Sequence, residues 1–202
     1  FSLTTMFIAV PTGVKIFNWI ATMWGGKLRF TTPMLFSIGL VLMFTIGGLS
    51  GVTHSVAPAD TQQTDTYYIV AHFHYVLFGG ALMGLFGGFY FWWPKIFGHF
   101  LDEKLGKVGF WTMFIGFNLT FGPMHILGLQ GMPRRTYTYR DDYGFNLWNM
   151  VSTFGAFVIH AWGMTEMSPL GAVCNLLPKH RGLDLQQRLD VQAKQGRAMY
   201  GV

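Results

Sequence analysis

Long stretches without charged side chains dominate the pattern of this chain. Asp, Glu, Lys and Arg are absent from residues 30–59, 66–94, 108–133 and 143–165, and residues 1–26 contain only Lys15. Each stretch is longer than the roughly 20 apolar residues with which a helix crosses about 30 Å of hydrocarbon. The pattern predicts five membrane-spanning helices, at about residues 1–24, 32–54, 66–94, 108–130 and 144–168.

We therefore expect an all-α fold, a polytopic transmembrane helix bundle over residues 1–168, followed by a tail at 169–202. The first apolar run has no basic segment before it and no small-residue cleavage site after it, so we interpret it as a span and not as a signal peptide. The apolar period fades in the tail, where a short surface helix and an unordered segment are both open alternatives.

The distribution of basic residues predicts which side of the membrane each loop faces. Loops 55–65 and 131–143, on the side of the N-terminus, hold three Lys and Arg residues, whereas loops 25–31 and 95–107 and the tail together hold ten. Cytoplasmic segments carry the excess of positive charge in membrane proteins. The tail is therefore predicted on the cytoplasmic side, or on the matrix side of a mitochondrion.

Composition excludes several other classes of protein. Charged residues make up 11% of the chain and hydrophobic residues 51%, whereas a soluble domain typically carries about 25% charged residues. A soluble globular domain and a disordered chain are therefore excluded, and the single cysteine, Cys174, allows no intrachain disulfide. The net charge of +5 comes from scattered basic residues without a clustered stripe, so we expect no nucleic-acid partner.

Two histidines lie within the third predicted span, where ionisable groups are costly and usually functional. His72 and His74 lie about 9 to 12 Å inside the membrane if the helix begins near Thr66. Two positions along a helix are about 200° apart, so the rings face opposite sides and do not easily share one metal ion. They suit two separate cofactors, and imidazole is a common ligand of haem iron. Hydrogen bonding to neighbouring helices is the alternative.

The other histidines lie at helix ends, in loops or singly within spans. We expect each of them to be structural or solvated: His54, His99, His125, His160 and His180.

Arg134 and Arg135 lie in a loop on the membrane side that is nearer to His72 and His74. Haem carries two propionate carboxylates, and arginine is well suited to bind carboxylates. The arginine pair is therefore a candidate site for these groups. An ordinary loop that contacts lipid headgroups is the alternative.

Lys15 lies roughly 13 Å from the nearer membrane surface and follows a break that the sequence Pro11-Thr12-Gly13 predicts in the first helix. A lysine at such a depth can exchange protons with water in a narrow channel. Thr12, on the same face of the helix, is positioned to hold such a water. Pairing with a carboxylate of another subunit is the alternative.

Four motifs in this order resemble the C-terminal part of subunit I of the haem-copper oxygen reductases, in particular the bacterial-type cytochrome c oxidases. They are AVPTGVK at 9–15, GGLSG at 47–51, DTYYIVAHFHYVL at 65–77 and GMPRR at 131–135. The resemblance covers about residues 1–168. It implies that the five spans correspond to the last five of the twelve helices of that subunit.

The resemblance implies two haems, one low-spin and one high-spin, of the haem A type. His72 matches the proximal ligand of the high-spin haem iron, and His74 matches an axial ligand of the low-spin haem iron. Phe73 matches a residue in the short electron path between the two haems. Copper at the oxygen site is also implied, with its ligands on helices that precede residue 1.

The resemblance also assigns roles outside the two histidines. Arg134 and Arg135 match residues that hold haem propionates, and Asp60 matches a carboxylate hydrogen-bonded in the same region. Lys15 and Thr12 match the lysine pathway that delivers protons to the oxygen site.

One departure from the family pattern concerns a further metal. Asp65 matches a ligand of a magnesium or manganese site, but Thr64 replaces the neighbouring histidine of the mitochondrial members, which leaves this metal open. The residues before Asp65 look more like those of bacterial members. A bacterial inner membrane is therefore favoured over the mitochondrial inner membrane.

The resemblance implies an activity that the chain completes only with other proteins. Electrons from cytochrome c pass through the low-spin haem to the haem-copper site, oxygen is reduced to water, and protons are pumped outward. The expected partners are the missing N-terminal part of subunit I, oxidase subunits II and III, cytochrome c, oxygen and membrane lipid. The chain is expected to be a fragment of a longer subunit or one half of a split one.

Other functions remain as alternatives. A quinol oxidase of the same family is close, whereas a nitric oxide reductase is less favoured because of the sequence around Lys15. A proton-coupled secondary transporter fragment belongs to a different class, and it predicts an inverted repeat that this sequence lacks. A purely structural membrane subunit leaves the histidines and the arginine pair unexplained.

Overall fold

The computed structural model describes residues 2–160, 172–173 and 197–198. The chain separates into two compact units, Phe1–Ile159 and His160–Val202. In the second unit, two short strands, β1 (Ala172–Val173) and β2 (Arg197–Ala198), pair antiparallel with Ala172 opposite Ala198. The part of the tail for which a surface helix and an unordered segment were the alternatives falls almost entirely outside the described residues.

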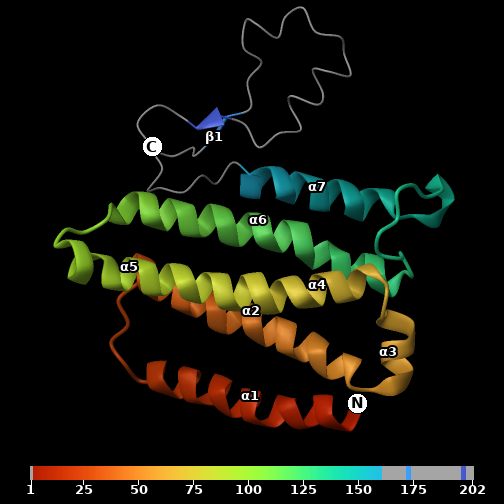
Figure 1. Cartoon of the computed structure of the whole chain (residues 1–202), viewed down its shortest axis with the longest axis horizontal. Helices are drawn as coiled ribbons and strands as arrows, with labels where there is room; N and C mark the ends of the chain where they lie inside the picture. Colours follow the sequence, from red (N-terminus) through yellow and green to blue (C-terminus); the bar gives the residue numbers. More distant parts are fainter. Residues whose placement is uncertain (1, 161–171, 174–196, 199–202) are drawn as a thin grey trace, which may run out of the picture. The chain divides into compact units, whose positions relative to one another are not determined.

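The first unit consists of helices that run back and forth (Figure 1). Their bounds are α1 (Ser2–Met23), α2 (Thr32–His54), α3 (Ala57–Gln63), α4 (Tyr67–Val76), the π-helix η1 (Leu77–Leu82), α5 (Met83–Phe97), α6 (Glu103–Leu129), the 3-10 helix η2 (Asp141–Tyr143) and α7 (Asn146–His160). α4, η1 and α5 follow one another without a gap and form one long rod.

Four helices among the described residues are long and apolar enough to cross a membrane: α1, α2, the rod Tyr67–Phe97 and α6. The predicted multi-pass helix bundle is therefore confirmed. The fifth predicted span corresponds to α7, and its last part, residues 161–168, lies outside the described residues.

Two local predictions differ from the structure. The predicted break in the first helix is wrong, because α1 runs through Pro11 without interruption. Proline removes one backbone N–H donor, whereas a helix within hydrocarbon has no solvent to satisfy further unpaired backbone groups. The polar connection expected at 55–65 contains the short helix α3, which has Pro58 in its first turn, where proline suits a helix.

The rod of α4, η1 and α5 packs closely against α2. It begins after Thr66, whose Oγ1 accepts a hydrogen bond from the Tyr68 N–H at 3.2 Å, and it ends at Gly98, which has a φ of +75°. Gly79 in η1 faces Met43 of α2 so closely that an added Cβ would lie 2.7 Å from the Met43 Cβ. Small residues at such crossings allow membrane helices to approach each other.

The centre of the first unit lies where α2, α4 and α6 meet. Met43, Tyr75 and Phe117, one from each helix, form a buried cluster. Beside it the Tyr75 hydroxyl donates to Asn118 Oδ1 at 2.8 Å, and Asn118 Nδ2 donates to the Phe114 carbonyl at 2.8 Å. The first of these hydrogen bonds joins α4 to α6 within an apolar interior, as polar side chains do between membrane helices, and the second holds Asn118 to its own helix.

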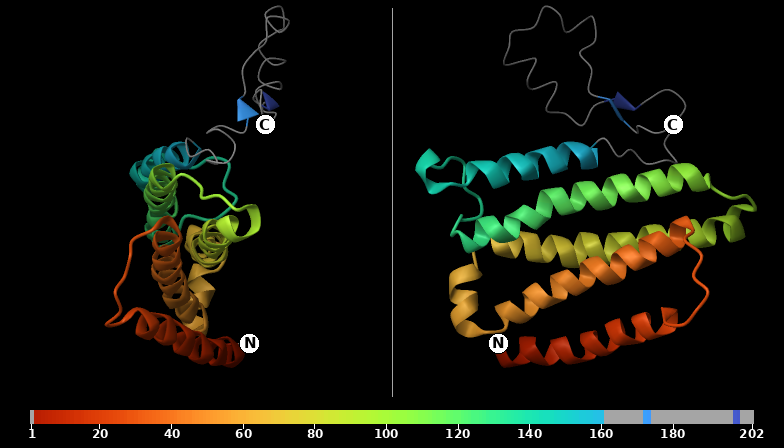
Figure 2. Two further views of the ribbon diagram at one scale, coloured as in Figure 1. Left: turned by 90° about the vertical axis from the view of Figure 1, so that its left-hand side faces the viewer. Right: turned by 180° about the vertical axis from the view of Figure 1, so that it is seen from behind.

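α1 packs differently from the other long helices. It contains no buried residue, and the end-on view in Figure 2 places it at one edge of the helical unit, next to α2. One contact between the two helices is the edge-on pair Trp19 and Phe44, with ring centroids 6.3 Å apart. The apolar side chains of α1 are therefore open to lipid or to other protein.

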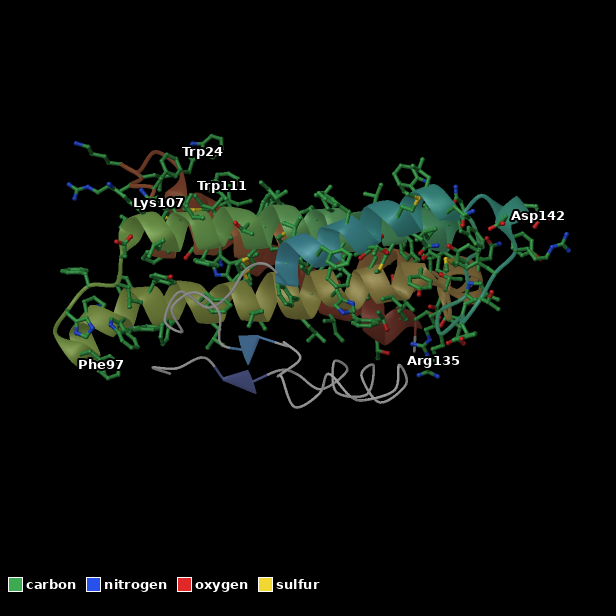
Figure 3. All side chains as sticks on the ribbon, turned by 90° about the horizontal axis from the view of Figure 1, so that it is seen from above. Trp24, Phe97, Lys107, Trp111, Arg135 and Asp142 are labelled. Atoms are coloured by element: carbon green, nitrogen blue, oxygen red, sulfur yellow. The ribbon has the colours of Figure 1, made fainter. Side chains whose placement is uncertain are left out.

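The loops gather at the two ends of the helical unit. Figure 3 shows Trp24, Phe97, Lys107 and Trp111 at one end, and Arg135 and Asp142 at the other. The two ends correspond to the two membrane sides that the charge pattern distinguished.

Candidate functional site

His72 and His74 face different neighbours of α4, as their spacing predicted. His72 Nδ1 lies 2.9 Å from the Gly47 carbonyl oxygen and 2.9 Å from Ser50 Oγ, both on α2. The His74 ring instead stacks on Phe121 of α6, with centroids 4.0 Å apart. The two rings therefore point to different sides of one helix.

Both rings are held through the same nitrogen. His74 Nδ1 lies 2.7 Å from the Val70 carbonyl oxygen of its own helix, as His72 Nδ1 does from a carbonyl of α2. A carbonyl can only accept a hydrogen bond, so Nδ1 carries the proton in each neutral ring and Nε2 keeps its lone pair. Metal-binding histidines are commonly oriented in this way.

A largely apolar cavity of about 360 Å³ opens beside His72. Glycines of the two helices that line it leave room within the cavity: Gly13 of α1, and Gly48 and Gly51 of α2. An added Cβ on Gly51 would lie 3.0 Å from His72 Cε1. The volume is within the range of cofactor pockets, roughly 300 to 1,000 Å³. An apolar slot with one available imidazole nitrogen fits a planar haem.

His54 and His125 lie near His72. This proximity was not predicted from the sequence. The rings of His54 and His72 are 5.0 Å apart, and Tyr68 lies edge-on to both His54 and His125. Nε2 of His54 and Nε2 of His125 are buried without a hydrogen-bond partner among the described residues, whereas Nδ1 of His54 has an ionic contact with Asp60. One signal could have found His54, because it lies on the helix face of Gly47, Ser50 and Gly51 by the spacing of three, four and seven residues.

Asp60 of α3 lies at the same end of the cavity. One of its carboxylate oxygens is 3.4 Å from His54 Nδ1. The structure therefore brings Asp60 near the His72 site through His54, and not through a direct contact with His72.

The arginine loop is attached to the beginning of α4. Arg134 Nη2 lies 2.9 Å from a carboxylate oxygen of Asp65, and the Arg134 backbone N–H donates to the Asp65 carbonyl at 2.8 Å. Asp65 and Arg135 have φ values of 59° and 62°, a conformation that is uncommon outside glycine. Arg135 is exposed, with no side-chain partner within the described part of the chain. Of the two cations, Arg135 is thus the one whose guanidinium is uncommitted.

The described residues contain no group of three or more His, Cys, Asp or Glu side chains that could hold a metal ion. Asp65 is paired with Arg134, and Thr64 beside it is exposed. The magnesium or manganese ligand role of Asp65 stays a prediction.

Thr12 and Lys15 differ in their surroundings. Thr12 lines the cavity beside His72, and its hydroxyl donates to the Ile8 carbonyl at 2.9 Å. Lys15 lies one turn further along α1, is exposed and is not among the residues that line the cavity. Within the described residues the two side chains therefore do not share one enclosed space.

Comparison with known proteins places this site in context. Residues 1–158 match the profile of the family described as Cytochrome C and Quinol oxidase polypeptide I. The chain belongs to this family. Membership in this cytochrome c and quinol oxidase family confirms the resemblance found in the motifs, and it implies haem and copper as cofactors.

Individual bacterial relatives are similar over most of the chain. Cytochrome c oxidase subunit 1 of Alkalihalophilus pseudofirmus is 54% identical over 161 residues, which is 80% of this chain and 26% of the relative. That of Thermostichus vulcanus is 57% identical over 159 residues, 79% of this chain and 28% of the relative. Quinol oxidase subunit 1 of Bacillus subtilis is 54% identical over 159 residues, 79% and 24% respectively. The chain thus spans about a quarter of the length of these relatives.

Proposed function

We propose that this chain is part of the catalytic subunit of a proton-pumping terminal oxidase, which uses electrons from cytochrome c to reduce oxygen to water. The observation that carries the proposal is the pair His72 and His74. Each ring is fixed through Nδ1 to a backbone carbonyl, and each leaves Nε2 available on an opposite side of α4. One haem iron on each side of α4 would account for the available Nε2 atom of each histidine.

The cofactors, when bound, supply the electron transfer and the oxygen chemistry, and the side chains of this chain position them. His72 would hold the high-spin haem iron in the cavity between α1 and α2, and His74 would hold the low-spin haem iron on the side of α6. Phe73 lies between them in sequence, with its ring centroid 4.4 Å from that of His74. Its position is compatible with a short electron path between the two sites.

The propionate carboxylates of the haems would lie at the end of the unit that carries Arg134, Arg135 and Asp60. Arg135 has its guanidinium free among the described residues, whereas Arg134 is already bound to Asp65 at 2.9 Å. We therefore assign direct charge pairing to Arg135 first, and we assign Arg134 both to the carboxylates and to the attachment of the loop. Asp60 would act through His54, its neighbour at 3.4 Å.

Lys15 and Thr12 would belong to the proton pathway. The location of Thr12 in the cavity wall beside His72 supports a place near its inner end. Lys15 is exposed and does not line the cavity, so the rest of its pathway would come from the remainder of subunit I or from another subunit.

The assembled enzyme would supply what this chain lacks. Copper ligands, the second axial histidine of the low-spin haem and the contacts that cover α1 would come from the N-terminal part of subunit I and from subunits II and III. Residues 1–168 would form the haem-binding bundle, and 169–202 a tail on the cytoplasmic side. The bacterial origin of the relatives supports a bacterial inner membrane.

Quinol remains a second candidate electron donor. The quinol oxidase subunit 1 of Bacillus subtilis is as similar to this chain, at 54% identity, as the cytochrome c oxidase subunit 1 of Alkalihalophilus pseudofirmus. Steady-state oxygen consumption by the purified complex with reduced cytochrome c and with a reduced quinol would separate the two donors.

A reduced-minus-oxidised optical spectrum of the detergent-solubilised native complex tests the proposal. We expect two haem populations, of which one binds carbon monoxide. A complex that contains this chain intact but shows no haem signal would contradict the proposal.

A further inference from the structure

Three atoms around His72 form a closed triangle of hydrogen-bond distances. His72 Nδ1 lies 2.9 Å from the Gly47 carbonyl oxygen and 2.9 Å from Ser50 Oγ, while Ser50 Oγ lies 2.8 Å from the same carbonyl oxygen. Ser50 is buried, with 5% of its surface exposed. Solvent therefore does not compete for these contacts.

Only one arrangement of protons satisfies the triangle. The Gly47 carbonyl can only accept, and Ser50 has a single hydroxyl proton, which it donates to that carbonyl. Ser50 Oγ must then accept from His72 Nδ1–H, which the carbonyl also accepts. The imidazole proton is shared between two acceptors on α2, and Nε2 carries the lone pair.

The shape of α2 supports the same geometry. Gly47, Ser50 and Gly51 lie on one face of the helix, three and four residues apart. An added Cβ on Gly47 would lie 2.9 Å from Val76 Cγ2, and one on Gly51 would lie 3.0 Å from His72 Cε1. The two glycines let α4 and the imidazole approach, which brings the ring within reach of the Ser50 hydroxyl.

We propose that Ser50 is a positioning residue for the haem-binding histidine of the cavity, and that it acts by accepting a second hydrogen bond from His72 Nδ1. This inference rests on the proposed function, because it assumes that His72 Nε2 binds iron. Ser50 itself would touch neither haem nor oxygen. An additional acceptor on Nδ1–H orients the ring and makes its Nε2 a stronger donor to the metal.

The test is resonance Raman spectroscopy of the reduced native complex, with Ser50→Ala compared with the unchanged chain. Loss of the acceptor weakens the electron donation of His72, so we expect the iron–histidine stretching band of the high-spin haem to shift to lower frequency. Potentiometric titration should give a higher reduction potential for that haem. The bands of the low-spin haem should not move, because His74 has no contact with Ser50.

Ser37→Ala is the matched control. Ser37 lies on the same helix and its hydroxyl donates to the Pro33 carbonyl at 2.9 Å, and among the described residues it has no hydrogen bond with a histidine. We expect it to leave both haem signals unchanged. Ser50→Thr keeps the hydroxyl and should restore the original band if the methyl group is accommodated.

The outcomes separate this inference from the proposed function. Absence of haem from the unchanged complex would overturn both. A normal haem content with an identical iron–histidine band in Ser50→Ala would overturn the role of Ser50 alone. If Ser50→Ala does not assemble, Ser50→Cys, which retains a weak acceptor, should show a smaller shift in the same direction, and an unmoved band in that variant would overturn the role.

Discussion

The two faces of α4 hold their histidines by different means. On one face His72 is bound by a carbonyl and a hydroxyl of α2 and borders an open cavity, whereas on the other His74 is bound by a carbonyl of its own helix and lies against Phe121 of α6. The orientation of His72 therefore depends on how two helices sit against each other. That of His74 depends on α4 itself and on aromatic packing.

This difference has a chemical counterpart in the proposed function. The high-spin haem that His72 would hold needs open space beside α4, and the cavity of about 360 Å³ lies on the His72 side. On the other face the ring of Phe121 stacks on His74 and is itself 4.8 Å, centroid to centroid, from the ring of Phe117, so aromatic side chains pack against this imidazole. One helix thus presents two environments only two residues apart.

Replacement of the two histidines should have the largest effect and should separate the two faces. We expect His72→Ala to abolish oxygen reduction and to remove the haem signal that binds carbon monoxide. His74→Ala should chiefly remove the low-spin haem signal. Optical spectra of both complexes, with and without carbon monoxide, provide the measurement. The exposed His99 offers a control, since His99→Ala should resemble the unchanged enzyme. Identical spectra for the two variants would refute separate cofactors.

Features set by a local pattern could be predicted from the sequence, whereas contacts between distant segments could not. The spans follow from uncharged runs, and the opposite directions of His72 and His74 follow from helix geometry, so both could be predicted. The pairing of Arg134 with Asp65 depends on a backbone contact between segments almost 70 residues apart, in which Thr66 pairs with Pro133. No local pattern encodes that contact.

The histidines that were assigned to structural roles show a second limit. His54 and His125 each stand alone in their own helix, so the sequence offers only the shared helix face as a signal for His54 and none for His125. Only the meeting of α2, α4 and α6 around Tyr68 brings their rings near His72. The predicted break at Pro11 failed for the opposite reason, since a local signal was overridden by the requirement that a helix in hydrocarbon pair its backbone groups internally.

Lys15→Met should have the second largest effect and should affect the His72 face alone. If Lys15 delivers protons to the oxygen site, its loss should slow proton-coupled reduction of that site on the order of 100-fold, the range typical of a lost proton-transfer group. Stopped-flow reduction at several pH values would measure it. Lys95→Met, which removes an exposed lysine over the Phe91 ring, serves as the control. An unchanged rate at every pH would remove Lys15 from the pathway.

Phe121→Leu should perturb the His74 face by a smaller amount. Leucine keeps an apolar side chain but loses the ring stacked on His74, an interaction worth about 0.5–1.5 kcal/mol for aromatic pairs. We expect a shifted low-spin haem spectrum and a modestly lower melting temperature of the complex, with the carbon monoxide difference spectrum unaltered. A shift of the high-spin signal instead would show that the two faces are coupled through α6.

Glu103→Gln should have the smallest effect, because it acts at the far end of the unit and should leave both faces alone. Glu103 at the beginning of α6 accepts a hydrogen bond from the Thr32 N–H of α2 at 2.7 Å, and an anion at a helix N-terminus contributes about 0.3–1 kcal/mol. Glutamine keeps the acceptor and removes the charge, so we expect a slightly lower melting temperature and unchanged haem spectra. Lys107→Met is the control for the ion pair with Glu103 at 3.5 Å, and it should cost less than Glu103→Gln if the helix end is the main partner. An altered haem spectrum in Glu103→Gln would show that the orientation of α2 at this end reaches His72.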